Sequence, residues 1–183
     1  MNEKEKMLAG EYYNSFDEEL VRDRERAKKL CKQLNDIPDA PVDERNKILQ
    51  ELFQTKKNCL IESPFRCDYG YNIKIGENFY ANFGCIILDC NIVKIGNNVL
   101  FAPNVQVYTA THPVNIADRI AGKEMAYPIE IGDNVWIGGG SIILPGVKIG
   151  ENTTIGAGSV VTKDIPPNTV AVGNPCRFIK QIK

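Results

Sequence analysis

Hydrophobic residues recur at every sixth position through most of the chain beyond residue 70. Among twelve such units, an aliphatic or aromatic residue fills the first position in all but one, and glycine fills the second position in six. The first positions are Ile75, Ala81, Ile87, Ile95, Phe101, Val107, Ile131, Ile137, Ile143, Ile149, Ile155 and Val161. A six-residue period is typical of a β-helix, in which each unit forms one short strand and one corner.

Three units complete one turn of such a coil, which therefore takes about 18 residues. The first-position side chain points inward and stacks on its equivalent in the next turn, while small residues allow the backbone to bend at the corners. The period slips by two residues between Ile87 and Ile95, so we expect Ile95 to lie over Ile75. An antiparallel sandwich would show alternation and hairpin turns, and the sequence has no such pattern.

Residues 1–58 have a helical pattern instead, with 25 of the 45 charged side chains and one glycine, Gly10. Ser15 and Glu18 have capping-box spacing and predict the start of a helix, which Pro38 and Pro41 end before a second helix begins. The predicted buried stripes are Leu20, Ala27, Leu30, Cys31 and Leu34, then Ile48, Leu49, Leu52 and Phe53. We expect this segment and the tail, 166–183, to cover the two ends of a coil formed by residues 59–165.

The period is interrupted once, at residues 111–128, between Val107 and Ile131. The interruption contains charges of both signs and ends in Tyr127-Pro128, which favours an ordered arm projecting from one corner. Its second residue is His112, the single histidine of the chain. Histidine exchanges protons near neutral pH, so a position where scaffold meets arm favours a catalytic base over a buried structural residue.

Composition excludes several classes of protein. The net charge is −1, from 22 basic and 23 acidic residues, which gives no indication of a nucleic-acid or anionic-membrane partner. The start, MNEKEKMLAG, lacks the apolar core of a secretory signal, and no apolar run is long enough to span a bilayer. The six cysteines lack zinc-type spacing. We expect a cytoplasmic protein with reduced, buried cysteines and no required metal.

Several longer stretches resemble one family over nearly the whole chain. EKMLAGEYYNSFDEELVRDRERAKKL is similar to the N-terminal segment of maltose acetyltransferases, and YTATHP, NVWIGGGSIILPGVKIG, GAGSVVTKDIPPN and VGNPCRFI follow in the family's order. The chain thus resembles the hexapeptide-repeat sugar O-acetyltransferases, the maltose, galactoside and nodulation-factor group. The resemblance implies a left-handed parallel β-helix and a homotrimer with active sites between neighbouring coils. It also implies transfer of acetyl from acetyl-CoA to a sugar hydroxyl.

The resemblance assigns roles to individual residues. His112 matches the general base that deprotonates the acceptor hydroxyl, and Asn82 matches the residue that stabilises the transition state. Acetyl transfer is then direct, without a covalent enzyme intermediate. The acceptor-binding positions map onto Asn14, Asp68, Asn82, Asp89 or its neighbour Cys90, and Glu124. Asn14, Asp68 and Glu124 differ from the galactoside-type residues, which favours a maltose or glucose acceptor.

The family's coenzyme-binding positions lie in the second half of the sequence. They map onto Gly139, Ala157, Thr162, Lys163, Arg177 and Lys180. Small residues permit close approach of the pantetheine arm, and cations suit the phosphates at the far end of coenzyme A. Trp136 is interpreted as a packing residue on the coil surface.

Three alternative functions fit the sequence less well. A zinc enzyme on this fold needs three histidines, and the chain has one. A non-catalytic β-helix scaffold would not need the arm at 111–128. An acyltransferase with an antibiotic or serine acceptor shares the histidine and the coenzyme positions, but lacks the maltose-type N-terminal segment.

Overall fold

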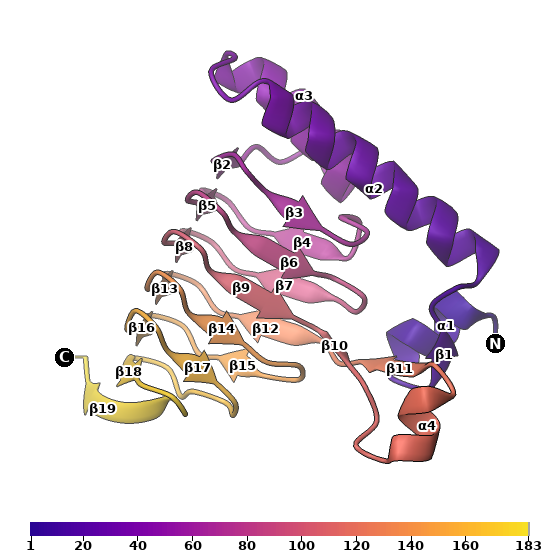
Figure 1. The fold of residues 1–183 in the computed structure, drawn as a ribbon. Coiled ribbons are helices and arrows are strands. Elements are labelled where there is room, and N and C mark those ends of the chain that lie inside the picture. Colours follow the sequence, from indigo (N-terminus) through magenta and orange to yellow (C-terminus); the bar gives the residue numbers. More distant parts are fainter. Residues whose placement is uncertain (183) are drawn as a thin grey trace.

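The computed structural model describes residues 1–182 of the chain as a parallel β-helix with helices over one end and an arm projecting from one side (Figure 1). The expected fold class, a left-handed parallel β-helix with a helical N-terminal segment and a protruding loop, is confirmed. No helix among the described residues has the length and hydrophobicity needed to cross a membrane.

Three sheets form the walls of the coil, and each is named here by its first strand. The β2 sheet contains β2 (Leu60–Ile61), β5 (Tyr80–Ala81), β8 (Leu100–Phe101), β13 (Trp136–Ile137), β16 (Thr154–Ile155), β18 (Thr169–Val172) and β19 (Arg177–Gln181). The β3 sheet contains β3 (Arg66–Cys67), β6 (Ile86–Leu88), β9 (Gln106–Tyr108), β14 (Ile142–Ile143) and β17 (Val160–Val161). The β4 sheet contains β4 (Ile73–Ile75), β7 (Val93–Ile95), β12 (Ile129–Ile131) and β15 (Lys148–Ile149).

The twelve predicted inward positions are all buried and form the core of the coil. Ile75 pairs in register with Ile95, as the two-residue slip predicts. The first turns are 20 residues long, since Ala81 pairs with Phe101, whereas a later turn from Ile137 to Ile155 takes 18 residues. The extra residues of the early turns all lie at one corner.

The outward faces of the three sheets differ in chemistry. The β2 sheet exposes Leu60, Leu100 and Trp136, the last with 51% of its surface exposed. Trp136 therefore lies on the coil surface, as predicted. The β4 sheet instead carries Lys74, Lys94, Glu130 and Lys148 on its outer side. An apolar wall and a charged wall thus coexist on one coil.

The N-terminal segment contains α1 (Glu3–Ala9), β1 (Tyr13–Asn14), α2 (Glu18–Asp36) and α3 (Val42–Phe53). Helices α2 and α3 lie across the β2 end of the coil (Figure 1). Apart from Ile48, which is partly buried, the residues of both predicted stripes are buried. The predicted capping box at Ser15 is wrong: Asp17 is the N-cap, and its carboxylate accepts from the Glu19 amide at 3.0 Å.

Arg45 fastens this helical segment to the coil. Its guanidinium is buried and donates to the carbonyls of Leu34 in the last turn of α2, of Ile37 at the C-cap and of Ile61 in β2, the last at 2.6 Å. These carbonyls include orphan acceptors at the C-terminal end of a helix, where a cation is favourable. The described cysteines are all buried, and none of them forms a disulfide, as predicted.

Candidate active site at the long corner

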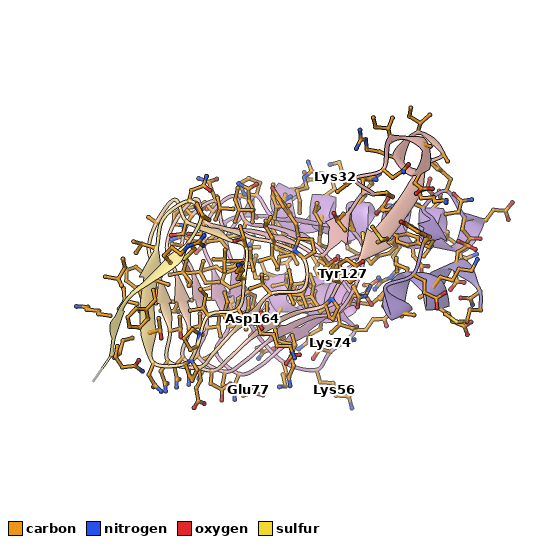
Figure 2. All side chains as sticks on the ribbon, turned by 90° about the horizontal axis from the view of Figure 1, so that it is seen from below. Lys32, Lys56, Lys74, Glu77, Tyr127 and Asp164 are labelled. Atoms are coloured by element: carbon orange, nitrogen blue, oxygen red, sulfur yellow. The ribbon has the colours of Figure 1, made fainter. Side chains whose placement is uncertain are left out.

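One corner of the coil, between the β3 and β4 sheets, is longer than the others and is called the long corner below. It comprises residues 68–72, 89–92 and 109–128 in three successive turns. The arm is therefore the largest of three insertions that stack at the same place. The arm contains β10 (Ala110–Thr111), α4 (Ile116–Ile120) and β11 (Lys123–Ala126). Viewed from below, it projects beyond the coil, with Tyr127 at its base (Figure 2).

Asp89 shapes this corner from within. Its carboxylate is fully buried and accepts backbone N–H groups of Asp68 at 3.1 Å, Tyr69 at 2.9 Å and Asn72 at 3.3 Å. Burial raises the pKa of Asp89 to about 8, against the opposing effect of these hydrogen bonds. Asp89 therefore faces the backbone of the preceding turn, and its neighbour Cys90 lies next to the polar side chains of the corner.

Cys90 joins two carboxylates from different turns. Its sulfur lies 3.4 Å from Asp68 Oδ2 and 3.8 Å from Glu124 Oε1. Burial is the largest cause that raises the pKa of both Cys90 and Asp68. The thiol is consequently neutral at physiological pH and donates its S–H to a carboxylate. These three groups form a small polar cluster with both donors and acceptors.

Tyr13 belongs to the same cluster, although the sequence did not identify it. Its hydroxyl donates to Glu124 Oε1 at 2.6 Å, and its side chain is buried. Burial raises the pKa of Tyr13 far above its ordinary value, so the phenol stays protonated. Asn14, the next residue, is exposed at the rim of the arm, and its backbone N–H donates to Glu3. No repeat pattern covers Tyr13, so only the fold reveals its contact with Glu124.

A satellite core supports the cluster from the N-terminal side. It consists of Met7, Tyr13, Leu20, Tyr69, Tyr71, Cys90 and Ala126, drawn from helices, corner and arm. Arg24 of α2 donates to the Tyr69 hydroxyl at 2.7 Å and to the Ser15 carbonyl. Asn91 donates to the Met7 and Ala126 carbonyls at 3.1 and 2.8 Å. The N-terminal segment thus forms one wall of the site.

His112 lies in the arm, directly after β10, and its side chain is exposed. Its Nδ1 lies 3.4 Å from the carbonyl oxygen of Lys123 in β11. A carbonyl oxygen only accepts hydrogen bonds, so this contact requires the proton on Nδ1. The lone pair is then on Nε2, on the opposite side of the ring, where it is available to accept a proton.

Asn82 lies at a different corner, between the β2 and β3 sheets. Its side-chain oxygen accepts from the Phe83 amide at 2.7 Å, which leaves the side-chain NH₂ free to donate elsewhere. Gly139 and Ala157 occupy the same corner two and three turns later, with the Gly158 amide bonded to the Gly139 carbonyl at 2.9 Å. A Cβ on Gly139 would lie 3.1 Å from the Pro103 carbonyl, so a side chain is poorly accommodated there. One chain therefore holds His112 and Asn82 at separate corners.

The other predicted coenzyme-binding residues lie toward the C-terminal end. Thr162 and Lys163 directly follow β17, on the same edge of the coil as the long corner but in a later turn. Arg177 and Lys180 lie on β19. All four are exposed, and none of the three cations forms an ion pair with a residue in the described range 1–182.

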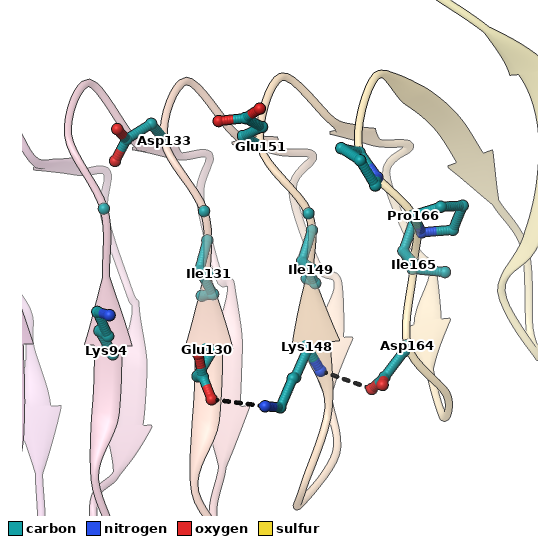
Figure 3. Close-up of a pocket in the computed structure, with 14 residues that line it drawn as sticks. Lys94, Glu130, Ile131, Asp133, Lys148, Ile149, Glu151, Asp164, Ile165 and Pro166 are labelled. Atoms are coloured by element: carbon teal, nitrogen blue, oxygen red, sulfur yellow. Dashed lines mark hydrogen bonds and ion pairs between the residues drawn. The ribbon is translucent and has the colours of Figure 1, made fainter.

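A groove of about 740 Å³ runs along the charged wall, where the β4 sheet turns toward the β2 sheet (Figure 3). Lys148 pairs with Glu130 at 2.9 Å inside it, and the backbone N–H of Lys148 donates to Asp164. None of the predicted site residues lines this groove. The chemistry therefore favours the long corner as the candidate active site.

Comparisons with known proteins identify the family of the chain. The maltose acetyltransferase hexapeptide capping motif matches residues 6–57, and the bacterial transferase hexapeptide (six repeats) matches residues 128–163. A curated relative from Dictyostelium discoideum, assigned as an acetyltransferase, is 53% identical over the whole chain and 95% of its own length.

Solved structures give the same result. A maltose O-acetyltransferase from Clostridium difficile 630 superposes with a TM-score of 0.98 at 57% identity, covering 100% of this chain and 98% of that one. A galactoside acetyltransferase in complex with coenzyme A has a TM-score of 0.93 at 45% identity and covers 100% and 92% of the two chains. The chain belongs to the hexapeptide-repeat acetyltransferases, in the group of the maltose and galactoside enzymes.

Proposed function

We propose that this chain transfers an acetyl group from acetyl-CoA to a hydroxyl of a small sugar of the maltose or glucose type. The observation that carries the proposal is the long corner, which holds both the exposed His112 and the polar cluster of Asp68, Cys90, Glu124 and Tyr13. A related acetyltransferase from Vibrio cholerae, complexed with acetyl coenzyme A, supports the donor; it is 36% identical and covers 100% of both chains, with a TM-score of 0.88.

In the proposed reaction His112 is the general base. Its Nε2 takes the proton from the acceptor hydroxyl while the hydroxyl oxygen attacks the thioester carbonyl carbon. The carbon–sulfur bond then breaks, and the proton passes to the departing thiolate, giving the acetyl ester and coenzyme A. A sugar hydroxyl is a very weak acid, so a positioned base contributes about 10²–10⁴ in rate. Asn82 donates its side-chain N–H to the oxyanion that forms on the carbonyl.

The acceptor pocket is proposed at the cluster of Asp68, Cys90 and Glu124, with Asn14 at its rim and Asn82 of a neighbouring subunit opposite. Carboxylate and amide oxygens accept hydrogen bonds from sugar hydroxyls, and each hydroxyl can also accept from the neutral thiol. Asp89 is assigned the supporting position, because its carboxyl group is buried and already accepts three backbone N–H groups.

The coenzyme is proposed to lie along the corner of Gly139 and Ala157, where small residues allow the pantetheine arm to approach the backbone. Thr162 and Lys163, with Arg177 and Lys180 on β19, fit the phosphate-bearing end by charge. The unpaired, buried thiols fit the reducing cytoplasm as the compartment.

The separation of His112 and Asn82 within one chain supports a homotrimer with active sites between subunits. When neighbouring coils pack side by side around a three-fold axis, the long corner of one chain can meet the Asn82 corner of the next chain. The exposed Leu100 and Trp136 give the β2 sheet an apolar surface suited to such packing, in contrast to the charged β4 sheet.

The proposal is tested by measuring thiol release from acetyl-CoA with glucose, maltose and a thiogalactoside, for wild type and His112→Ala. We expect maltose or glucose to stimulate release, and the alanine variant to lose at least about 10²-fold in kcat with unchanged coenzyme affinity. Serine and an aminoglycoside run in parallel test the other acceptor classes. Coenzyme binding without stimulation by any sugar would overturn the sugar acceptor, and no coenzyme binding would overturn the enzyme assignment.

A further inference from the structure

The general base is held by a three-stranded sheet that lies outside the coil. β11 is the central strand of this arm sheet, between β10 of the arm and β1 of the N-terminal segment. β11 runs antiparallel to both neighbours, pairing Thr111 with Met125 on one side and Tyr13 with Glu124 on the other. The strand that positions His112 through the Lys123 carbonyl is therefore itself positioned by the N-terminus.

The strand register aligns three residues in one row across this sheet. Ala110 pairs with Ala126 and Thr111 with Met125. His112 follows directly after β10, and the same register continued by one residue would set it opposite Glu124. Tyr13 pairs with Glu124 from the other side. Residues directly opposite in antiparallel strands place their side chains on the same face, so Tyr13, Glu124 and His112 follow one another on one face.

The pairing of β1 with β11 depends strongly on the side chain of Tyr13. β1 has two residues, and a strand pair of that length contributes little by its backbone alone. The Tyr13 hydroxyl adds a 2.6 Å hydrogen bond to the Glu124 carboxylate, with only 3% of the Tyr13 surface exposed. A hydrogen bond to a charged acceptor is stronger than one between neutral groups, and this one closes the sheet on the side away from His112.

We infer that Tyr13 is a positioning residue for the general base: its hydrogen bond to Glu124 fixes β11, so that the Lys123 carbonyl holds His112 with the proton on Nδ1. The mechanism assigned above to His112 rests on the proposed function, but its tautomer is a property of the folded chain alone. Loss of the Tyr13 hydroxyl lets β11 shift, which releases Nδ1 and allows the proton to move to Nε2. That tautomer cannot accept a proton at Nε2.

The single histidine makes this inference directly measurable. Untagged, full-length protein labelled with ¹⁵N-histidine gives one imidazole signal set, whose long-range ¹H–¹⁵N correlations distinguish the two neutral tautomers. We expect the neutral imidazole of wild type to be in the Nδ1–H form. In Tyr13→Phe, which keeps the buried ring, we expect a mixture of tautomers and about tenfold lower kcat, with the KM for acetyl-CoA unchanged.

Tyr12→Phe is the matched control. Tyr12 lies next to Tyr13 and stacks under the Lys123 ammonium at 5.0 Å, a contact that its ring makes without the hydroxyl. We expect its histidine spectrum and kcat to equal those of wild type. Glu124→Leu removes the same hydrogen bond from the other partner, and we expect it to give the same tautomer mixture as Tyr13→Phe, including when the two are combined.

The outcomes separate positioning from function. A histidine spectrum in both Tyr13→Phe and Glu124→Leu identical to that of wild type would overturn the positioning role. Should one variant fail to fold, the other decides by the same spectrum. If wild type acetylates no acceptor, the proposed function fails while the spectra still decide the role of Tyr13.

Discussion

The coil and the segments attached to it are stabilised in different ways. In the coil, each inward residue stacks on its equivalent in the next turn, as Phe101, Ile137 and Ile155 do, and backbone ladders join neighbouring turns. At the long corner, single side chains join distant segments, as Tyr13 joins Glu124 across 111 positions. The coil is thus a regular scaffold. The N-terminal segment and the long corner, which both interrupt or lie outside the six-residue repeat, supply every group of the proposed acceptor pocket except Asn82.

The largest effect should come from the coil. Ile137→Ala removes a buried layer in the middle of the stack, and we expect it to lower the free energy of unfolding by about 3 kcal/mol. The outward Lys94→Ala, which removes an exposed side chain of the β4 sheet, should change it by less than about 0.5 kcal/mol. Urea unfolding followed by far-UV circular dichroism measures both, and equal effects would contradict a core made by inward stacking.

The N-terminal segment and the arm should loosen without loosening the coil. Asn91→Ala removes the bonds that tie the Met7 and Ala126 carbonyls to the corner. We expect the acceptor KM to rise about tenfold, because buried carbonyls lose their partner and the arm loosens. Hydrogen exchange should accelerate in α1 and β11 but not in β13. Uniform acceleration across the coil would show that the two regions unfold as one unit.

The buried carboxyl group of Asp89 predicts that the stability of the fold depends on pH. The pKa of Asp89 is raised from 3.8 to about 8, so the folded state binds more protons than the unfolded state between these values. Stability therefore falls as the pH rises through this window. Asp89→Asn should remove this decline, and its thermal midpoint should change less between pH 5 and 8 than that of wild type, as seen by scanning calorimetry. Parallel curves for the two proteins would contradict the assignment.

The smallest effect should come from the exposed cations. Lys163→Ala removes one charge that we propose contacts coenzyme phosphates. We expect a severalfold rise in the KM for acetyl-CoA that shrinks with added salt, because exposed charge pairs contribute about 0.2–1 kcal/mol. Lys94→Ala on the charged wall is the control, with no change. Equal behaviour of the two variants would remove Lys163 from the coenzyme site.

The regular part of the molecule was predictable from sequence, and the reason is physical. A six-residue period determines which side chain points inward, and all twelve positions from Ile75 to Val161 are buried. The slip before Ile95 correctly predicted that Ile95 lies over Ile75, and the structure places the extra residues of the early turns at the long corner. The arm at 111–128 was identifiable for the same reason.

The remaining part of the site depends on contacts that no period encodes. Tyr13 and Arg24 come from the N-terminal segment and meet Glu124 and Tyr69 only after the helices pack. Local signals were also ambiguous: Ser15 and Asp17 are both good N-cap residues, and the structure uses Asp17. The Ser15 carbonyl instead accepts from Arg24.

The central claim is that the proposed active site lies between two chains. The arm of one chain, which carries His112, meets the corner of its neighbour that holds Asn82, Gly139 and Ala157. The claim is tested by producing His112→Ala and Asn82→Ala together in one cell and measuring acetyl transfer by the purified mixed assemblies. With sites between neighbouring chains of a trimer, random assortment leaves about one quarter of the sites with both residues intact, and we expect about that share of wild-type activity. Activity no greater than that of the two separate variants would contradict the claim, because every chain then carries one defect in its own site.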